Sequence, residues 1–197
     1  MHRLSSGDKI PKLTGQALSG QEISLSDYSG APLILSFYRY AGCQLCNLRM
    51  HDFIKKYKKS YEPAGINAIA VFQSPIDKMN KYTSEHDAPF EIISDPDYLW
   101  YDAFGLENSW AGLLKAMFKP KPFLRSVAKG YSRVDPDGSM NRLPADFLIN
   151  EKGIIDVAFY SKDVSEHIPF KTISKWINQS AVKSKSNYKK TKRRELA

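Results

Sequence analysis

The sequence predicts an α/β fold in which helices cover both faces of a mixed central sheet. A β-rich apolar run after Pro32, a helical pattern and a second buried run, Ile66 to Phe72, form a β-α-β unit. Near the other end, Ala145 to Asn150 and Ile154 to Tyr160 flank the turn residues 151–153 and predict a closing β-hairpin. A parallel unit followed by an antiparallel hairpin predicts a mixed sheet.

The chain is expected to open with an N-terminal β-hairpin. Leu13 to Leu18 and Gln21 to Leu25 have the composition of short strands, and Ser19-Gly20 between them is a turn signal. Residues 26–30 then form a loop that leads into the first central strand.

That strand leads directly to the two cysteines of the chain. Leu33 to Tyr38 predicts a buried strand, Ala41-Gly42 interrupts it, and a helix with regularly spaced apolar residues follows to about Tyr61. Cys43 then lies at the mouth of this helix and Cys46 one turn inside it. Free backbone N–H groups and the helix dipole favour a thiolate at this place.

The later segments complete the predicted topology. We expect a helix at about residues 75–86, a short strand at Pro89 to Ile93, a helix after Asp95-Pro96, and a last helix at Ile168 to Ile177. Residues 109–140 form an insertion in which Trp110 to Phe118 predicts an amphipathic helix. We expect that helix to pack on its own domain, with a lid, an oligomer contact or a membrane-surface element as alternatives.

Composition indicates one domain with a tail. The 197 residues are 42% hydrophobic, which predicts one globular domain at residues 1–182 and a basic tail at 183–197. The tail carries seven basic residues and one acid, or +6 of the formal +8, so the folded part is nearly neutral. We expect the tail to be disordered and to contact neither nucleic acid nor membrane.

The sequence also predicts a cytoplasmic location. Its apolar runs are shorter than the roughly 20 residues of a membrane span, and the N-terminus does not resemble a secretory signal. In that compartment a Cys-x-x-Cys pair is more often catalytic or metal-binding than structural.

Four segments, in this order, carry a family resemblance. They are Gly7–Pro11 with Ile23–Asp27, Leu35–Cys46, Ser94–Pro96 with Tyr101–Gly105, and Leu143–Asn150 with Gly153. Together they resemble the thioredoxin-like superfamily, and within it the peroxiredoxin-like branch of the alkyl hydroperoxide reductase/thiol-specific antioxidant group. The resemblance implies a thioredoxin-like fold and thiol-based redox chemistry.

The site departs from both families that it resembles. Against the peroxiredoxin motif, Arg39 replaces a proline, Cys43 takes the threonine or serine place and Cys46 takes the peroxidatic place. Pro144 stands where peroxiredoxins have an arginine and resembles the cis-proline that thioredoxins place beside their disulfide. Ser36 stands where thioredoxins bury an aspartate. The site therefore combines features of the two.

The predicted function is thiol-dependent redox chemistry through a reversible Cys43–Cys46 disulfide, without a metal or an organic cofactor. In a thioredoxin mode Cys43, expected to be exposed, attacks a protein disulfide and Cys46 resolves it. In a peroxiredoxin mode Cys46 attacks a peroxide and condenses with Cys43. A thioredoxin- or glutathione-type reductant completes either cycle, and the oligomeric state stays open, with a homodimer as one option.

The alternatives to this function are a zinc site, two inert cysteines and a non-catalytic binding module that uses the basic segments. Zinc prefers four ligands, and the chain has one Cys-x-x-Cys and four scattered histidines. A pair that never forms a disulfide would favour the binding module.

Three further residues are candidates for a supporting role. Arg39 can stabilise a thiolate or hold a peroxide oxygen, or be a solvated loop arginine. Tyr40 can form a wall of the site, or be plain core. Pro144 in the cis form would leave a free backbone edge for a substrate chain, while Arg49, deeper in the helix, is expected to be a surface charge.

Overall fold

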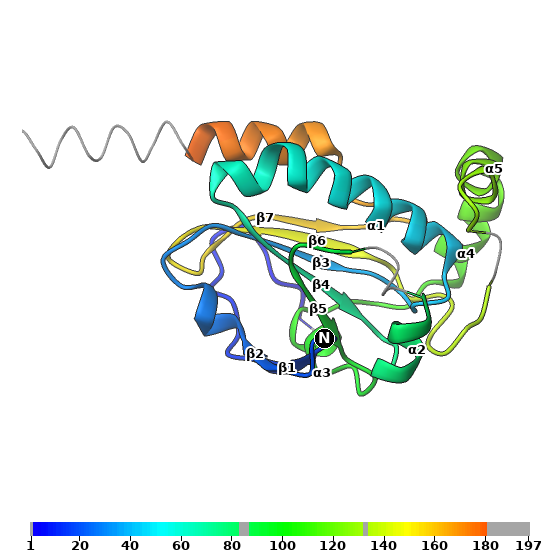
Figure 1. Ribbon diagram of the computed structural model, residues 1–197, viewed down its shortest axis with the longest axis horizontal. Coiled ribbons are helices and arrows are strands. Elements are labelled where there is room, and N and C mark those ends of the chain that lie inside the picture. The colour runs from blue at the N-terminus through cyan, green and yellow to red at the C-terminus, as the bar shows by residue number, and fades with distance from the viewer. Residues whose placement is uncertain (1, 83–86, 132–133, 181–197) are drawn as a thin grey trace, which may run out of the picture.

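The central sheet is mixed, as the sequence predicts. The computed structural model describes residues 2–82, 87–131 and 134–180, and in this part of the chain seven strands lie in the order β2-β1-β5-β4-β3-β6-β7 (Figure 1). The strands are β1 (Thr14–Ala17), β2 (Glu22–Ser24), β3 (Leu33–Phe37), β4 (Asn67–Phe72), β5 (Glu91–Ser94), β6 (Ala145–Ile149) and β7 (Ile155–Tyr160).

Strand β3 occupies the middle of this sheet and leads to the cysteines. It pairs in parallel with β4 and antiparallel with β6, and all five of its residues are buried. Strand β4 pairs in parallel with β5, while the β1–β2 and β6–β7 hairpins form the two antiparallel edges. A strand buried on both faces needs a nearly continuous apolar run, and Leu33–Phe37 is apolar except at Ser36.

Helices cover both faces of the sheet, which confirms the predicted fold class. On one face lie α1 (Gln44–Lys56) and, beside it, a last helix at residues 170–180 (Figure 1). On the other face, α3 (Leu99–Ala103) packs Trp100 and Tyr101 into the main core with Phe37. The short α2 (Ile76–Tyr82) follows β4 and buries Met79 beside α1 and both cysteines.

The Asp95 carboxylate explains why a short helix forms at α3. It accepts hydrogen bonds from the backbone N–H groups of Leu99, Trp100 and Tyr101, which begin the helix. The Tyr101 hydroxyl then lies 2.7 Å from the carbonyl oxygen of Tyr38. This segment therefore fixes the end of β3, just before the cysteines.

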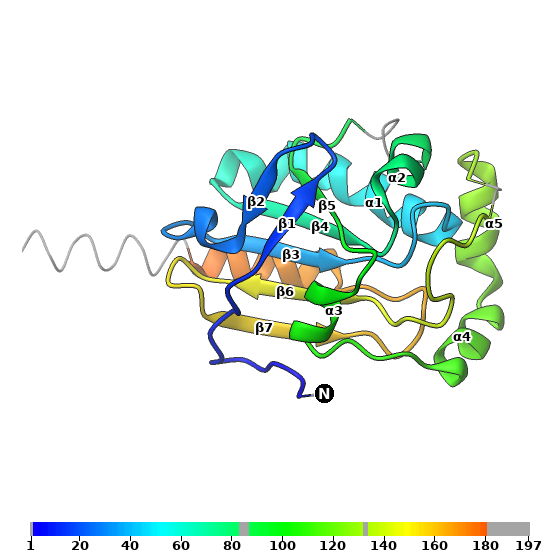
Figure 2. The same ribbon diagram turned by 90° about the horizontal axis from the view of Figure 1, so that it is seen from below.

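The segment at 109–140 contains two helices, α4 (Trp110–Met117) and α5 (Pro120–Ala128), of which only the first was predicted. They lie beyond the end of the sheet where β3 leads into α1 (Figure 2). The entering and leaving chains run side by side, because Ser109 donates to the carbonyl of Asn141 and Leu143 donates to that of Glu107. Helix α5 packs on α1.

Two predicted segments lie partly or wholly outside the described residues. The end of the helix predicted at 75–86 is one, since α2 is described to Tyr82, and the basic tail at 183–197 is the other. Within the described residues, no helix is long and apolar enough to cross a membrane.

Candidate functional site

Cys43 is the N-cap of α1, and Cys46 lies in its first turn, as predicted. The Cys43 backbone is extended, with φ −83° and ψ 111°, and its sulfur accepts a hydrogen bond from the Cys46 N–H at 3.2 Å. The helix therefore uses a sulfur where other helices use a Ser, Thr, Asp or Asn oxygen. Both thiols are free and lie near one another at the positive end of the helix.

Arg39 contacts the Cys43 sulfur directly. Its Nη2 donates to Cys43 Sγ at 2.9 Å, and its Nη1 donates to the carbonyl oxygen of Met140 at 2.8 Å. The side chain is only 5% exposed, so it is not a solvated loop arginine. Its Nε is buried without a partner among the described residues. The guanidinium therefore brings a charge to the sulfur and keeps one N–H unused.

The two thiols have opposite acidities. Burial by itself raises the pKa of Cys43, but hydrogen bonding to the Cys46 thiol, the Arg39 charge and the Cys46 N–H outweigh burial and lower that pKa to about 6. Burial and the neighbouring Cys43 both raise the pKa of Cys46 well above its ordinary value. Near neutral pH the pair therefore consists of a Cys43 thiolate and a Cys46 thiol.

The expectation that Cys43 is exposed is wrong. Cys43 is 1% and Cys46 2% exposed. Both sulfurs lie in an apolar cluster with Tyr40 and Leu45, and Phe123 of α5 packs against it. The cover comes from the 109–140 segment, which the strand and helix patterns around the cysteines do not reveal.

Tyr40 belongs to that buried cluster and also contacts Arg39. It is 2% exposed, and its ring centroid lies 5.3 Å from the Arg39 guanidinium carbon, within reach of a cation–π interaction. Tyr40 is therefore a core residue in the cluster that contains both sulfurs.

The loop between β3 and α1 is held by the 134–140 segment. Ala41 N–H donates to the Ser74 hydroxyl at 2.6 Å, and that hydroxyl donates to Asp137 at 2.8 Å. Gly42 and Asp135 form an isolated β-bridge, and a Cβ at Gly42 would lie 2.5 Å from the Asp135 carbonyl oxygen. Only glycine permits this close approach.

The predicted cis form of Pro144 is wrong, because none of the described peptide bonds is cis. Pro144 directly precedes β6, which pairs with β3 from Ala145 opposite Phe37. Its carbonyl accepts a hydrogen bond from Ser161 N–H, and a proline needs no N–H partner at the start of a strand. Pro144 is therefore an ordinary buried proline that lies immediately before the first paired residue of β6.

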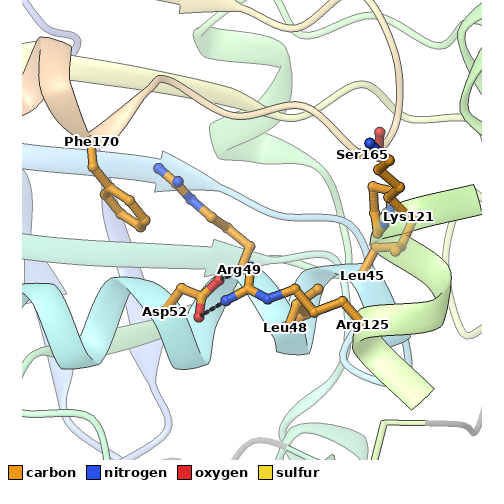
Figure 3. A pocket seen from close by; sticks show the side chains of 9 residues that line it. Leu45, Leu48, Arg49, Asp52, Lys121, Arg125, Ser165 and Phe170 are labelled. Atoms are coloured by element: carbon orange, nitrogen blue, oxygen red, sulfur yellow. Dashed lines mark hydrogen bonds and ion pairs between the residues drawn. The ribbon is translucent and has the colours of Figure 1, made fainter. Parts of the chain in front are cut away.

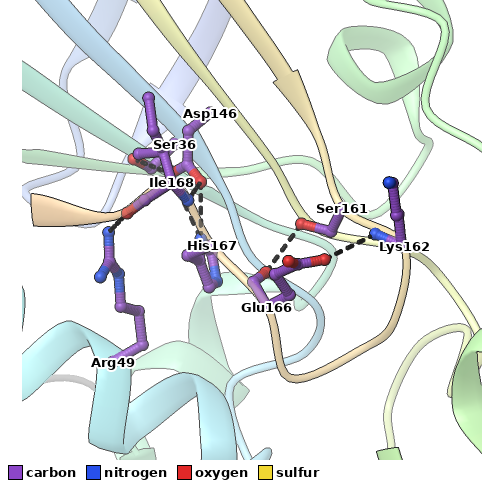
Figure 4. Close-up of polar contacts among 8 residues, drawn as sticks. All are labelled: Ser36, Arg49, Asp146, Ser161, Lys162, Glu166, His167 and Ile168. Atoms are coloured by element: carbon purple, nitrogen blue, oxygen red, sulfur yellow. Dashed lines mark hydrogen bonds and ion pairs between the residues drawn. The ribbon is translucent and has the colours of Figure 1, made fainter. Parts of the chain in front are cut away.

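Arg49 is not the surface charge that the sequence predicted. Its Nη2 donates to the Ile168 carbonyl at 2.8 Å, and its guanidinium carbon lies 4.0 Å from the centre of the Phe170 ring. Figure 4 shows it reaching from α1 to the chain that precedes the last helix. The loop at 168–170 therefore covers it, a contact between segments far apart in the sequence.

A buried carboxylate lies in the sheet, and sequence reasoning missed it. Asp146 of β6 is fully buried and accepts hydrogen bonds from the Ser36 hydroxyl at 2.7 Å and from Ile168 N–H at 2.8 Å (Figure 4). His167 Nδ1 lies 3.1 Å from the same carboxylate. Ser36 was noted as replacing a buried aspartate; the strand that pairs with it supplies one instead.

A groove of about 370 Å³ lies beside the site, between α1, α5 and the loop before the last helix (Figure 3). Leu45, between the two cysteines, lines it together with Leu48 and Phe170. Arg125 of α5 forms an ion pair with Asp52 of α1 across it, with Nη1 and Oδ2 2.7 Å apart. The ion pair therefore joins the cover to the cysteine helix.

Comparison with known proteins identifies the family. A model described as the AhpC/TSA family matches residues 6–158. The chain belongs to the AhpC/TSA family. The match includes β3, both cysteines, β6 and the first part of β7. Membership confirms the predicted thiol-dependent redox function and makes the chain an oxidoreductase.

Curated relatives and solved structures agree with AhpC/TSA membership. Peroxiredoxin Bcp of Escherichia coli is 25% identical over 186 residues, which cover 92% of this chain and all of that protein. The structure of peroxidoxin BcpB from Mycobacterium tuberculosis aligns with a TM-score of 0.61 at 16% identity, over 83% of this chain and 90% of that one. Peroxiredoxin 6 of Arenicola marina gives 0.66 at 13% identity, over 89% and 72%. These structures share the fold.

The described residues contain no candidate metal site. Among them, no group of three or more His, Cys, Asp or Glu side chains lies together in a way that could hold a metal ion. Within this AhpC/TSA frame, the chemically distinctive group is the buried Arg39–Cys43–Cys46 set.

Proposed function

We propose that this protein is a thiol peroxidase in which Cys43 is the attacking thiolate and Cys46 the resolving thiol. The observation that carries the proposal is the 2.9 Å contact between Arg39 Nη2 and Cys43 Sγ, together with the lowering of the Cys43 pKa to about 6. A peroxide-reducing thiol reacts as the thiolate, and Cys46 is the thiol that keeps its proton.

The first step oxidises Cys43. Its thiolate attacks the terminal oxygen of a hydroperoxide, the S–O bond forms and the O–O bond breaks. The departing alkoxide takes a proton to give an alcohol, and Cys43 becomes a sulfenic acid. In this step the unused Nε–H of Arg39 donates to a peroxide oxygen, where negative charge develops.

The second step forms the disulfide. Cys46 loses its proton and its sulfur attacks the Cys43 sulfenic sulfur, while the departing hydroxide takes a proton to give water. Cysteines at i and i+3 of a helix start are close enough to join in this way. A thioredoxin- or glutathione-type dithiol or thiol reductant then returns both cysteines to the reduced form by thiol–disulfide exchange.

This assignment reverses the alignment, in which Cys46 takes the peroxidatic place. Cys43 has the N-cap position, the N–H of Cys46 and the contact with Arg39, and each of these stabilises negative charge on sulfur. We also propose a cytoplasmic location, because a reducing compartment supplies the reductant that the cycle needs.

Stopped-flow thiol loss on mixing the reduced protein with hydrogen peroxide tests the proposal. The wild type and Cys46→Ser should react far faster than free cysteine, and Cys46→Ser should accumulate a sulfenic acid that dimedone traps. Cys43→Ser should react no faster than free cysteine. If Cys43→Ser instead reacts fast and Cys46→Ser slowly, Cys46 is the attacking and Cys43 the resolving cysteine. The protein would still be a peroxidase, but the assignment of the two cysteines would be wrong.

Dithiol–disulfide exchange is the second candidate, because the site has a Cys-x-x-Cys rather than one cysteine at the helix start. In that case neither variant nor the wild type reacts quickly with peroxide. The reduced wild type then reduces the disulfides of insulin, and Cys43→Ser does not.

A further inference from the structure

Helices α4 and α5 expose most of their large apolar side chains, only Leu113 and Phe123 being partly buried, and their fully buried residues are small or polar. On α4 the buried residues are Gly112 and Ala116, and on α5 the buried residue is Ser126. The exposed fractions of the large apolar side chains are 72% for Trp110, 56% for Leu114, 66% for Met117, 78% for Phe118, 69% for Leu124 and 54% for Val127. An amphipathic helix of a globular domain ordinarily does the opposite. A patch of this kind marks an interaction site.

This orientation of the two helices is fixed by specific contacts. A Cβ at Gly112 would lie 3.2 Å from the backbone oxygen of Lys162, so the small face of α4 lies close against the domain. Lys119, between the two helices, forms an ion pair at 2.6 Å with Asp163, whose side chain is 1% exposed. Together with the ion pair that joins Arg125 to α1, these contacts direct the apolar faces outward.

The same segment is strongly basic. From Asn108 to Val134 the sequence contains no Asp or Glu. Its basic residues are Lys115, Lys119, Lys121, Arg125, Lys129 and Arg133, of which Lys119 and Arg125 form the ion pairs with Asp163 and Asp52. A second copy of this face would bring like charges together, which disfavours self-association through it. Lys and Arg around exposed Trp, Phe and Leu instead match the headgroups and the acyl boundary of an anionic bilayer.

We propose that α4 and α5 dock on the surface of an anionic lipid bilayer, with the aromatic and aliphatic side chains at the acyl boundary and the lysines at the headgroups. Such a helix pair lies on the membrane and does not cross it. Both helices stand at one end of the molecule, beyond the sheet, where a flat surface can reach them (Figure 2). The proposal does not depend on the peroxidase proposal.

Tryptophan fluorescence of the full chain can report docking. Of the three tryptophans, Trp110 is 72% exposed, whereas Trp100 and Trp176 are 1% and 5% exposed. Vesicles of phosphatidylglycerol mixed with phosphatidylcholine should therefore shift the Trp110 emission to the blue and sediment the protein. Binding to vesicles of phosphatidylcholine alone should be at least about tenfold weaker, because the lysines then have no anionic headgroups to contact.

Matched variants assign the binding to the patch. Leu114→Ser with Phe118→Ser should weaken vesicle binding about tenfold or more, because both side chains leave the acyl boundary. Leu99→Ser is the control, since Leu99 is 64% exposed on α3, outside the patch. Removal of residues 183–197 should leave the Trp110 shift in place, which separates the patch from the basic tail.

Three results would overturn the proposal. They are equal binding to both kinds of vesicle, unchanged binding of the Leu114→Ser/Phe118→Ser variant, and a concentration-dependent dimer that this variant abolishes while vesicles bind neither protein. The last result would assign the patch to a second copy. The variant should react with hydrogen peroxide at the wild-type rate, so failure of docking and failure of the peroxidase proposal are distinguishable.

Discussion

Arg39 and Cys43 form a buried pair, with Nη2 and Sγ 2.9 Å apart and both side chains at most 5% exposed. A guanidinium holds its charge at every relevant pH, so it stabilises the thiolate continuously. The carbonyl of Met140 binds the other terminal nitrogen and keeps the guanidinium in place. The acidity of Cys43 therefore depends on the 134–140 segment as well as on the helix start.

Arg39→Gln should raise the Cys43 pKa from about 6 by at least about one unit, because an opposite charge at contact distance typically shifts a pKa by 1–3 units. The thiolate absorbance in the ultraviolet, followed against pH in the Cys46→Ser background, measures this. The rate with hydrogen peroxide should fall about tenfold or more.

Arg39→Lys is the matched control for this prediction. It retains the charge but loses the two-pronged geometry, so its Cys43 pKa should lie between those of the wild type and Arg39→Gln. An unchanged pKa in Arg39→Gln would mean that the helix start alone produces the thiolate.

Gly42→Ala should displace the 134–140 segment and thereby weaken the hold of Met140 on Arg39. The added Cβ would meet the Asp135 backbone at 2.5 Å, and backbone cannot move aside as a flexible side chain can. We expect a raised Cys43 pKa and a slower peroxide reaction. Asp135→Asn keeps the backbone, so it should leave the Cys43 pKa unchanged and alter the rate of the peroxide reaction by no more than about twofold. Equal effects of both variants would assign the role to the carboxylate.

Much of the fold follows from local patterns in the sequence. The alternation of apolar runs and turn residues predicts both hairpins and the strand before the cysteines, and each forms within one or two residues of its expected place. The position of Cys43 at the helix mouth also follows, because Ala41-Gly42 interrupts the strand and a helical pattern begins directly after it.

The rest depends on contacts between distant segments. The cover over Cys43 comes from α5, and its sequence pattern does not indicate which face meets the site, because its apolar Leu124 and Val127 are exposed while Ser126 is buried. Periodicity does predict α4, but it cannot tell whether the apolar face meets the domain or solvent. Asp146 and His167 are 21 residues apart and meet only once the last loop folds back on β6. Pro144 fits a cis-proline motif by resemblance alone.

Phe123→Ala should expose Cys43 to reagents. Phe123 of α5 packs against the cluster that contains both sulfurs, so truncation opens a path through the cover. We expect alkylation of the reduced protein by iodoacetamide to become several-fold faster, with little change in the Cys43 pKa. Leu124→Ala is the control. Leu124 is the next residue along α5, but its side chain is 69% exposed and covers no sulfur. Equal alkylation of Phe123→Ala and the wild type would show that reagents reach Cys43 by another path.

Asp146→Asn should destabilise the protein near neutral pH. It should also remove the part of the pH dependence of the free energy of unfolding that comes from this carboxyl. Burial alone would raise the pKa of Asp146, but the His167 charge and hydrogen bond, Arg49 and the Ile168 N–H outweigh burial and hold that pKa below 3.8. A depressed folded-state pKa contributes stability that is fully present above the unfolded value of 3.8 and is lost as the pH falls through the folded value.

Urea unfolding across this acidic range measures the effect. We expect Asp146→Asn to lose about 2 kcal/mol near neutral pH, the usual scale for weakening hydrogen bonds to a buried charged group. The difference from the wild type should narrow as the pH falls below 3.8, because the wild-type carboxyl then takes up a proton and loses its charge. Asp97→Asn, at an exposed position, should match the wild type throughout. A constant difference at every pH would instead mean that Asp146 stabilises the sheet through hydrogen bonds that do not need its charge.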